Sequence, residues 1–167
     1  MIHEIRPYSG SDQTVFENLF LDYFFTDYKI ILSEAQLIEI CGDIIQLVKA
    51  GSSFLDLLFT DDRPIGFILY QKDSLDNEWC AKEGWGFIRE IFVSRCFRKR
   101  GYGKHLVTSA EQKLKGLSVP GVYIALEDNP DFWLKRGYVE TDEIYEKNDG
   151  FIFVKPFSYG SSFPAAQ

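Results

Sequence analysis

The sequence has few of the residues that bind metals or form covalent bridges. Its 167 residues include three cysteines, two histidines and one methionine, and Cys41, Cys80 and Cys96 are widely spaced. The cysteines match neither a metal-ligand spacing nor a disulfide framework. We therefore expect no metal site and a reducing, cytoplasmic environment.

Long apolar runs and an excess of positive charge are also missing. No apolar run reaches the ~20 residues that span a bilayer, and the segment Met1–Pro7 lacks the basic and apolar regions of a signal peptide. The 18 Lys and Arg residues against 25 Asp and Glu give a net charge of −7. We therefore expect neither a membrane nor a nucleic acid as partner.

The sequence does contain enough apolar residues for a folded core. Apolar residues make up 46% of the chain and aromatic residues 16%. This composition and length predict a single domain over residues 1–157. The small, polar residues 158–167 predict a frayed C-terminal tail.

The most informative stretch runs from Gly84 to Gly116. Aromatic and β-branched residues predict a buried strand over 87–93. Apolar residues recur at helical spacing from Leu106 to Leu117, and Gly116 stands where a C-terminal glycine would end the helix. Between them lies the cation- and glycine-rich segment Arg98–Lys104. The first backbone N–H groups of a helix have no internal partner, and glycine lets a ligand approach them closely. This junction predicts a site for a phosphate or pyrophosphate.

Two common phosphate-binding motifs do not fit this junction. A P-loop would need glycine at position 98 and Ser or Thr at position 105, where the chain has Arg98 and His105. A dinucleotide fingerprint would need a third glycine in place of Leu106. An enzyme that binds ATP or NAD at this turn is therefore kept only as a third alternative.

The pattern Arg98-x-x-Gly101-x-Gly103, directly after a strand ending in Ile-Phe-Val, resembles a loop of the GNAT superfamily of acyl-CoA-dependent N-acyltransferases. In that family the Gln/Arg-x-x-Gly-x-Gly/Ala loop holds the pyrophosphate of coenzyme A. The resemblance implies acetyl-CoA as the cosubstrate. It also implies a set of contacts to that cosubstrate: the strand backbone at Ile91, Phe92 and Val93, the loop residues Arg98, Lys99, Arg100, Gly101, Tyr102, Gly103 and Lys104, and later Asn129 and Trp133.

The remaining patterns follow the family's order of elements, β-α-α-β-β-β-α-β-α-β-β. Capping boxes at Thr14/Glu17 and Ser33/Gln36 predict the starts of the first two helices. The resemblance implies an α/β GNAT fold with a mixed, mostly antiparallel sheet. Its one parallel β-α-β crossover would join strands at 87–93 and 122–127, which splay apart to admit the pantetheine arm. The other expected strands cover residues 2–6, 54–60, 65–71, 138–147 and 151–155.

Glu90 is the candidate general base for deprotonating an amine. It is an acidic residue in an otherwise apolar strand, and burial would raise its pKa towards a useful value. Strand alternation places Glu90 and Phe92 on one face, with Arg89, Ile91 and Val93 on the other. The alternative is that Glu90 forms a structural ion pair with a neighbouring Arg or Lys. Many relatives have a second acid at the position of Arg89.

The segment Phe132–Tyr138 departs from the family pattern Phe-Tyr-x-x-x-Gly-Phe. Trp133 occupies the position of the tyrosine whose hydroxyl lies near the coenzyme A sulfur, and an indole is no practical proton source. Tyr138 is a second catalytic candidate, although the family usually packs Phe at this position. Asn129 matches a pantetheine-contacting Asn, with a shorter spacing to Phe132 than the family usually has.

The resemblance therefore implies an N-acetyltransferase. It would transfer an acetyl group from acetyl-CoA to a primary amine by direct attack in a ternary complex. The main alternative, motivated by Trp133 and Arg89, is a non-catalytic acyl-CoA-binding or sensor domain of the same fold. The identity and charge of the acceptor amine stay open. Dimers are common in the family, so a homodimer is compatible with the sequence.

Overall fold

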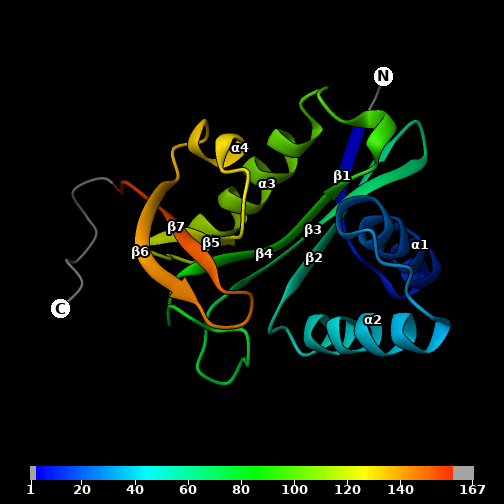
Figure 1. Ribbon diagram of the computed structural model, residues 1–167, viewed down its shortest axis with the longest axis horizontal. Helices are drawn as coiled ribbons and strands as arrows, with labels where there is room; N and C mark the ends of the chain where they lie inside the picture. Colours follow the sequence, from blue (N-terminus) through cyan, green and yellow to red (C-terminus); the bar gives the residue numbers. More distant parts are fainter. Residues whose placement is uncertain (1–2, 160–167) are drawn as a thin grey trace.

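The computed structural model describes residues 3–159, so Ile2 of the expected first strand and residues 160–167 of the expected tail lie outside it. The described chain forms one seven-stranded sheet with the order β1-β2-β3-β4-β5-β7-β6 (Figure 1). All neighbouring strands are antiparallel except β4 and β5. The strands are β1 His3–Pro7, β2 Phe54–Thr60, β3 Arg63–Lys72, β4 Gly86–Val93, β5 Gly121–Leu126, β6 Val139–Tyr145 and β7 Gly150–Pro156.

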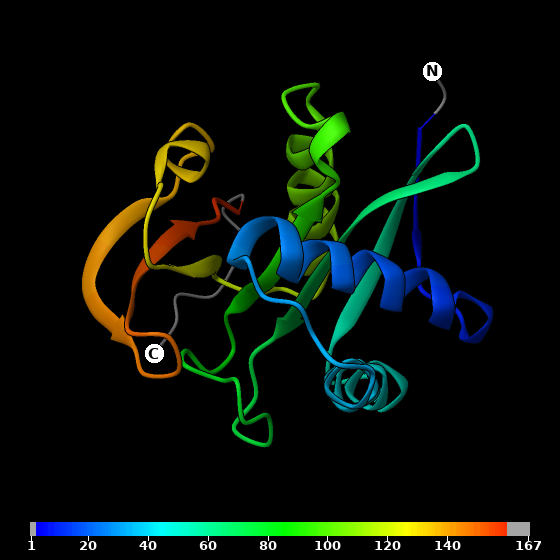
Figure 2. The same cartoon turned by 45° about the vertical axis from the view of Figure 1, so that its right-hand side comes forward.

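Four α-helices cover the two faces of the sheet. Helices α1 (Gln13–Tyr23) and α2 (Glu34–Lys49) pack on one face, and α3 (Tyr102–Gly116) and α4 (Asp131–Leu134) lie on the other (Figures 1 and 2). Each face has its own apolar cluster, so the sheet is buried between two cores. This architecture confirms the predicted GNAT fold and order of elements. Across residues 3–159, no helix is both long and apolar enough to cross a membrane.

Within residues 3–159, the only parallel neighbours, β4 and β5, separate soon after they begin. They pair at Gly86 with Val122 and at Phe87 with Tyr123, and β5 then continues beside β7 (Figure 1). Helix α3 provides the crossover between them. The backbone of β4 from Ile88 onward therefore faces an opening on the β5 side, as the resemblance predicted.

One local prediction about a helix end was wrong. Thr14 and Glu17 form no capping box, because α1 begins at Gln13 and a short 3₁₀ turn at Gly10–Asp12 precedes it. The carboxylate of Asp12 instead accepts the Ser9 N–H at 2.9 Å and pairs with Arg6. Helix α3 ends at Gly116, as expected, and Leu117, the last residue of the predicted helical spacing, lies just beyond it and is exposed. The capping box of Ser33 and Gln36 is present at α2.

The alternation expected along β4 is broken by a β-bulge. Leu69 pairs with Glu90 and the next residue of β3, Tyr70, pairs with Ile88, which leaves Arg89 without a partner on β3. A bulge inserts one residue and re-aims its side chain. The sequence predicted Arg89 on the face opposite Glu90, together with Ile91 and Val93. The structure differs: Arg89 and Glu90 line the same two cavities, which are described below.

Helix α1 continues into a π-helical turn, Phe24–Tyr28, that ends at Lys29 in the left-handed conformation (φ 59°). A π-helix brings residues i and i+5 together, and such turns are frequent at functional sites. Here the spacing places Tyr28 against Tyr23, with their hydroxyl oxygens 3.0 Å apart.

Candidate functional site

The turn before α3 has the backbone geometry that the glycine pattern requires. Gly101, the N-cap of α3, has a φ of 86°, a conformation that favours glycine. A Cβ at Gly103 would lie 3.2 Å from the Phe132 ring, so glycine lets α4 approach the helix. Arg98 is held by its neighbours: Nε donates to the Val93 carbonyl at 2.7 Å, and Nη2 contacts the Asp27 carboxylate at 2.7 Å.

A cavity of about 440 Å³, here called the α3 cavity, opens at the N-terminus of α3. Its walls come from β4, the α3 turn and the segment around α4. Beside it lies a second space of about 490 Å³, the cationic hollow, lined by Thr26, Lys29, Arg95, Arg98 and Lys99. Arg98 and Lys99 line both spaces. Four cations around one hollow, on a chain with a net charge of −7, favour an anionic ligand there.

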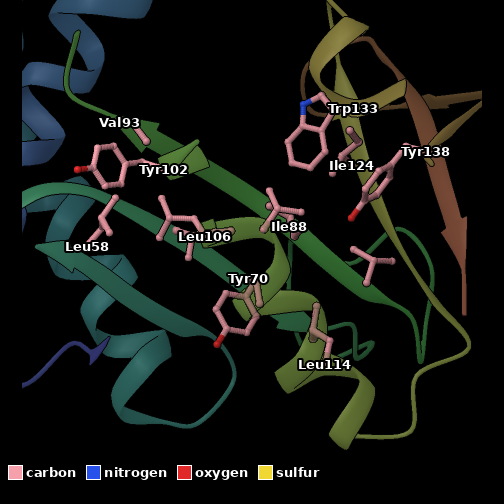
Figure 3. Packing of buried hydrophobic residues seen from close by; sticks show 14 of the residues in the cluster. Leu58, Tyr70, Ile88, Val93, Tyr102, Leu106, Leu114, Ile124, Trp133 and Tyr138 are labelled. Carbon is pink, nitrogen blue, oxygen red and sulfur yellow. The ribbon is translucent and has the colours of Figure 1, made fainter. Parts of the chain in front are cut away.

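A smaller space of about 160 Å³, the central cavity, lies where β4 and β5 diverge. Ile91 and Trp133 line both this cavity and the α3 cavity. In Figure 3 the Trp133 indole, from α4, lies beside Ile124 of β5 and over Ile88 of β4. The indole therefore stands where the two cavities meet.

Glu90 reaches the central cavity from the α1 side of the sheet. Its carboxylate accepts a short hydrogen bond from the Tyr23 hydroxyl, and none of the ion pairs among residues 3–159 involves it. Burial raises the pKa of Glu90, against the opposing effects of the Tyr23 hydrogen bond and the Arg89 charge. A structural ion pair is therefore not what holds Glu90 in place.

Tyr23 links Glu90 to Tyr28. Because the single Tyr23 proton is donated to Glu90, Tyr28 must be the donor in its 3.0 Å contact with Tyr23. Tyr28 is half-exposed and lines the central cavity. Burial raises the pKa of both tyrosines, so both hydroxyls are protonated at neutral pH.

A fourth space of about 680 Å³, the α2 cavity, lies between α1, α2 and the loop before β4. Arg89 and Glu90 line both this cavity and the central cavity. Three cavities thus form a series, from α3 through the divergence of β4 and β5 to α2. Two ligands entering from opposite sides would meet beside Glu90.

Most of the predicted site residues lie in this series of cavities. The predicted residues that line the α3 cavity, together with Asp27, Phe97 and Phe132, are Ile91, Val93, Arg98, Lys99, Tyr102, Gly103, Asn129 and Trp133. Asn129 has a left-handed backbone (φ 52°). The side chain of Phe92 packs in the α1–α2 core, so only its backbone faces the β4–β5 opening. Arg100 stacks over Phe97 at 5.7 Å, and it and the exposed Lys104 line none of the cavities described here.

Tyr138 lies outside the cavities. It is 1% exposed, and its hydroxyl donates a 2.8 Å hydrogen bond to the Glu111 carboxylate. The same carboxylate forms an ion pair with Lys155. Burial raises the pKa of Tyr138, and the Glu111 charge raises it further. Tyr138 packs edge-on against Trp133, with ring centroids 5.1 Å apart. The structure thus shows Tyr138 as a support for Trp133 and gives it no contact with the central cavity.

Sequence reasoning missed Tyr23, Tyr28, Lys29 and Trp79. Tyr23 belongs to the apolar stripe of α1, and such a stripe by itself predicts only a core residue, which the burial of Tyr23 also fits. Tyr28 and Lys29 follow α1 closely, and nothing in the sequence there signals a π-helical turn. Trp79 lies in the loop between β3 and β4, where its ring stacks on Arg89 at 3.6 Å. No periodicity connects these residues to the glycine-rich turn.

Comparison with known proteins agrees with this geometry. The model of the acetyltransferase (GNAT) family matches residues 14–153. A PaiA N-acetyltransferase from Thermoplasma acidophilum, crystallised with coenzyme A, aligns with a TM-score of 0.72 and 18% identity over 94% of this chain and 100% of its own. A GNAT acetyltransferase from Staphylococcus aureus aligns with a TM-score of 0.74 and 15% identity, over 93% and 99%.

A third solved structure, a GNAT acetyltransferase from Brucella melitensis in complex with acetyl-CoA, aligns with a TM-score of 0.65 and 16% identity over 95% of this chain and 90% of its own. No match was found in sequence among curated proteins. At these identities the solved structures establish the fold, while the family model covers most of the chain. The chain therefore belongs to the GNAT acetyltransferase family.

Proposed function

We propose that the protein is an N-acetyltransferase that moves an acetyl group from acetyl-CoA to a primary amine. The observation that carries this proposal is the series of three cavities in which the central cavity, lined by Glu90, lies between the α3 cavity and the α2 cavity. The α3 cavity and the cationic hollow would hold the cosubstrate, and the α2 cavity would admit the amine. Structural relatives crystallised with coenzyme A or acetyl-CoA support this assignment.

Binding of the cosubstrate uses the α3 turn. The first N–H groups of α3 and the four cations of the cationic hollow would hold its phosphates. The unpaired β5-facing edge of β4 near Ile91–Val93 would hydrogen-bond the pantetheine amides. Acetyl-CoA then supplies the acetyl group as a thioester inside the central cavity.

Glu90 acts as the general base in this proposal. It takes a proton from the attacking amine, whose nitrogen bonds to the acetyl carbon as the carbon–sulfur bond breaks. Burial holds the pKa of Glu90 above its ordinary value, which improves its match to an amine near neutral pH. Trp133 can donate a hydrogen bond to the departing thiolate but no proton.

Tyr28 would provide the proton that the departing thiolate needs. It is the half-exposed phenol of the hydrogen-bonded series Glu90–Tyr23–Tyr28, all three members of which line the central cavity. Tyr28 protonates the sulfur, Tyr23 returns a proton to Tyr28, and Glu90 returns to Tyr23 the proton it took from the amine. The amine proton thus ends on the thiol, and all three side chains return to their starting state.

The test is acetyl-CoA-dependent thiol release across a panel of primary amines, with wild type and Glu90→Gln. We expect turnover with at least one amine, and a loss of roughly 10²–10⁴-fold in Glu90→Gln, as for removal of a general base. Wild-type turnover should rise with pH through the raised pKa of Glu90, because only the carboxylate accepts the proton.

Calorimetry with coenzyme A provides the control, since Glu90→Gln should bind it as wild type does. A protein that binds acetyl-CoA but releases no thiol above hydrolysis with any amine would instead be a sensor domain. A Glu90→Gln turnover within a factor of about 3 of wild type would remove Glu90 from the role of base, since that role is worth far more.

A further inference from the structure

The guanidinium of Arg89 has no anionic partner in the described chain. Its Nε and Nη1 are buried, and neither has a hydrogen-bond partner within residues 3–159. None of the ion pairs in that part of the chain includes Arg89, although Glu90 is its neighbour in sequence. Burying charged donors without acceptors is costly, so this arrangement suits a ligand that brings the acceptors with it.

The position of Arg89 is fixed by the elements around it. The bulge in β4 turns it towards Glu90, and the Trp79 ring stacks on its guanidinium at 3.6 Å. Tyr145 in turn holds Trp79 through a 3.0 Å hydrogen bond to its carbonyl oxygen. A guanidinium held flat against a ring keeps its edge available for a bidentate contact with a carboxylate.

Arg89 also stands in the right place to orient an acceptor. It and Glu90 are consecutive residues that line both the α2 cavity and the central cavity. If an acceptor bound Arg89 through its carboxylate, an amine on the carbon next to that carboxylate would lie beside Glu90. The substituent on that carbon would enter the α2 cavity, whose walls include the apolar side chains of Phe20, Phe24, Ile40, Ile44 and Leu47.

We propose that the acceptor is a free α-amino acid with an apolar side chain, bound through its carboxylate by Arg89. This inference rests on the proposed N-acetyl transfer and specifies its substrate class. Arg89 acts as a substrate-binding residue in this scheme, and Trp79 as its positioning residue.

The first experiment compares leucine with leucinamide as acceptors for wild type and Arg89→Gln. The two acceptors differ only in the carboxylate, and the amide has the more easily deprotonated amine, so intrinsic reactivity favours the amide. Hydrogen bonds to charged groups are worth about 1.5–3 kcal/mol, or roughly 10–150-fold in affinity. We therefore expect wild type to prefer leucine in kcat/KM by at least about tenfold, and Arg89→Gln to lose that preference.

The matched control is Arg63→Gln, which removes an Arg that stacks on Phe97 and lines none of the three cavities. It should keep the wild-type preference, and Arg89→Lys should keep part of it. If Arg89 is only structural, Arg89→Gln should reduce activity on both acceptors equally. That result, or equal use of both acceptors by wild type, would overturn the proposal.

Failure of the N-acetyl transfer itself would look different, because no amine would then release thiol. In that case calorimetry of leucine against the coenzyme A complex still tests the site without turnover. Wild type should bind leucine more tightly than leucinamide, and Arg89→Gln should bind both weakly. Absence of leucine binding to wild type would overturn the assignment of Arg89 to a carboxylate.

Discussion

At the scale of single residues, the hydroxyl groups of Tyr23 and Tyr28 bear on the pKa of Glu90 and on the passage of its proton. The Tyr23 hydroxyl donates to the carboxylate and lowers its pKa, which partly offsets the effect of burial. The Tyr28 hydroxyl contacts that of Tyr23, and it is Tyr23 that donates to the Glu90 carboxylate. Tyr23→Phe therefore both shifts the pKa of Glu90 and removes one step of the proton relay, whereas Tyr28→Phe affects the relay alone.

Tyr23→Phe should move the acidic limb of the turnover profile to higher pH. Removal of the hydrogen bond destabilises the charged form of Glu90, so its pKa rises further and the active carboxylate appears only at higher pH. Tyr28→Phe should lower turnover, by analogy with other proton donors roughly 10²-fold or more, and leave the acidic limb in place. The measurement is kcat against pH for both variants.

Coenzyme A affinity serves as the control for both tyrosine variants and should stay close to that of wild type. If Tyr28→Phe kept the wild-type turnover, the Tyr28 hydroxyl would be excluded as the source of the thiol proton. An unmoved acidic limb in Tyr23→Phe would mean that the titrating group in the profile is not Glu90.

At the scale of elements, the turn that leads into α3 carries the cosubstrate. Gly101→Asp should weaken coenzyme A binding by at least roughly 100-fold, because a carboxylate would stand before the N–H groups that the phosphates need. The helix itself should persist, since Asp is a good N-cap residue and tolerates left-handed backbone better than most residues. The dissociation constant is measured by calorimetry.

Gly116→Asp is the matched control, since it makes the same change at the other end of the same helix. A Cβ at Gly116 meets nothing within 4 Å, so the substitution fits the structure. It should leave coenzyme A affinity within about twofold of wild type, because charge effects at a helix end fall off within one turn. Equal affinity in Gly101→Asp and wild type would remove the turn from the phosphate site.

The predictability of the fold from the sequence also differs between elements. The strand–turn–helix around Arg98–Lys104 was recognisable because glycines, cations and helical spacing occur together, and the order of the other elements followed. The bulge at Arg89 was not recognisable, since it depends on how β4 pairs with β3. The π-helical turn at Phe24–Tyr28 has no distinct sequence signal either. Both features arise from packing between distant segments, and both place side chains in the candidate site.

At the scale of the whole molecule, the sheet must be tied to helices on both faces for the cavities to keep their shape. Asp56 of β2 is one such tie to α3. It is 1% exposed, accepts the Tyr70 hydroxyl at 2.9 Å and contacts the Lys113 ammonium at 2.8 Å. The three groups span β2, β3 and α3, so they join the sheet to the helix whose N-terminus forms the phosphate turn.

Asp56→Ala should lower the free energy of unfolding by about 2 kcal/mol. Loss of one partner of a buried ion pair typically costs 3–5 kcal/mol, but Lys113 is 43% exposed and can be rehydrated, which reduces the cost. Lys147→Ala is the contrasting variant, since its 3.5 Å pair with Glu78 is exposed and should contribute less than about 0.5 kcal/mol. Urea denaturation measures both changes. If both variants lost the same small amount, Asp56 would not hold α3 on the sheet, and the rigidity of the phosphate turn would have to come from the apolar contacts of Leu106, Val107 and Leu114 alone.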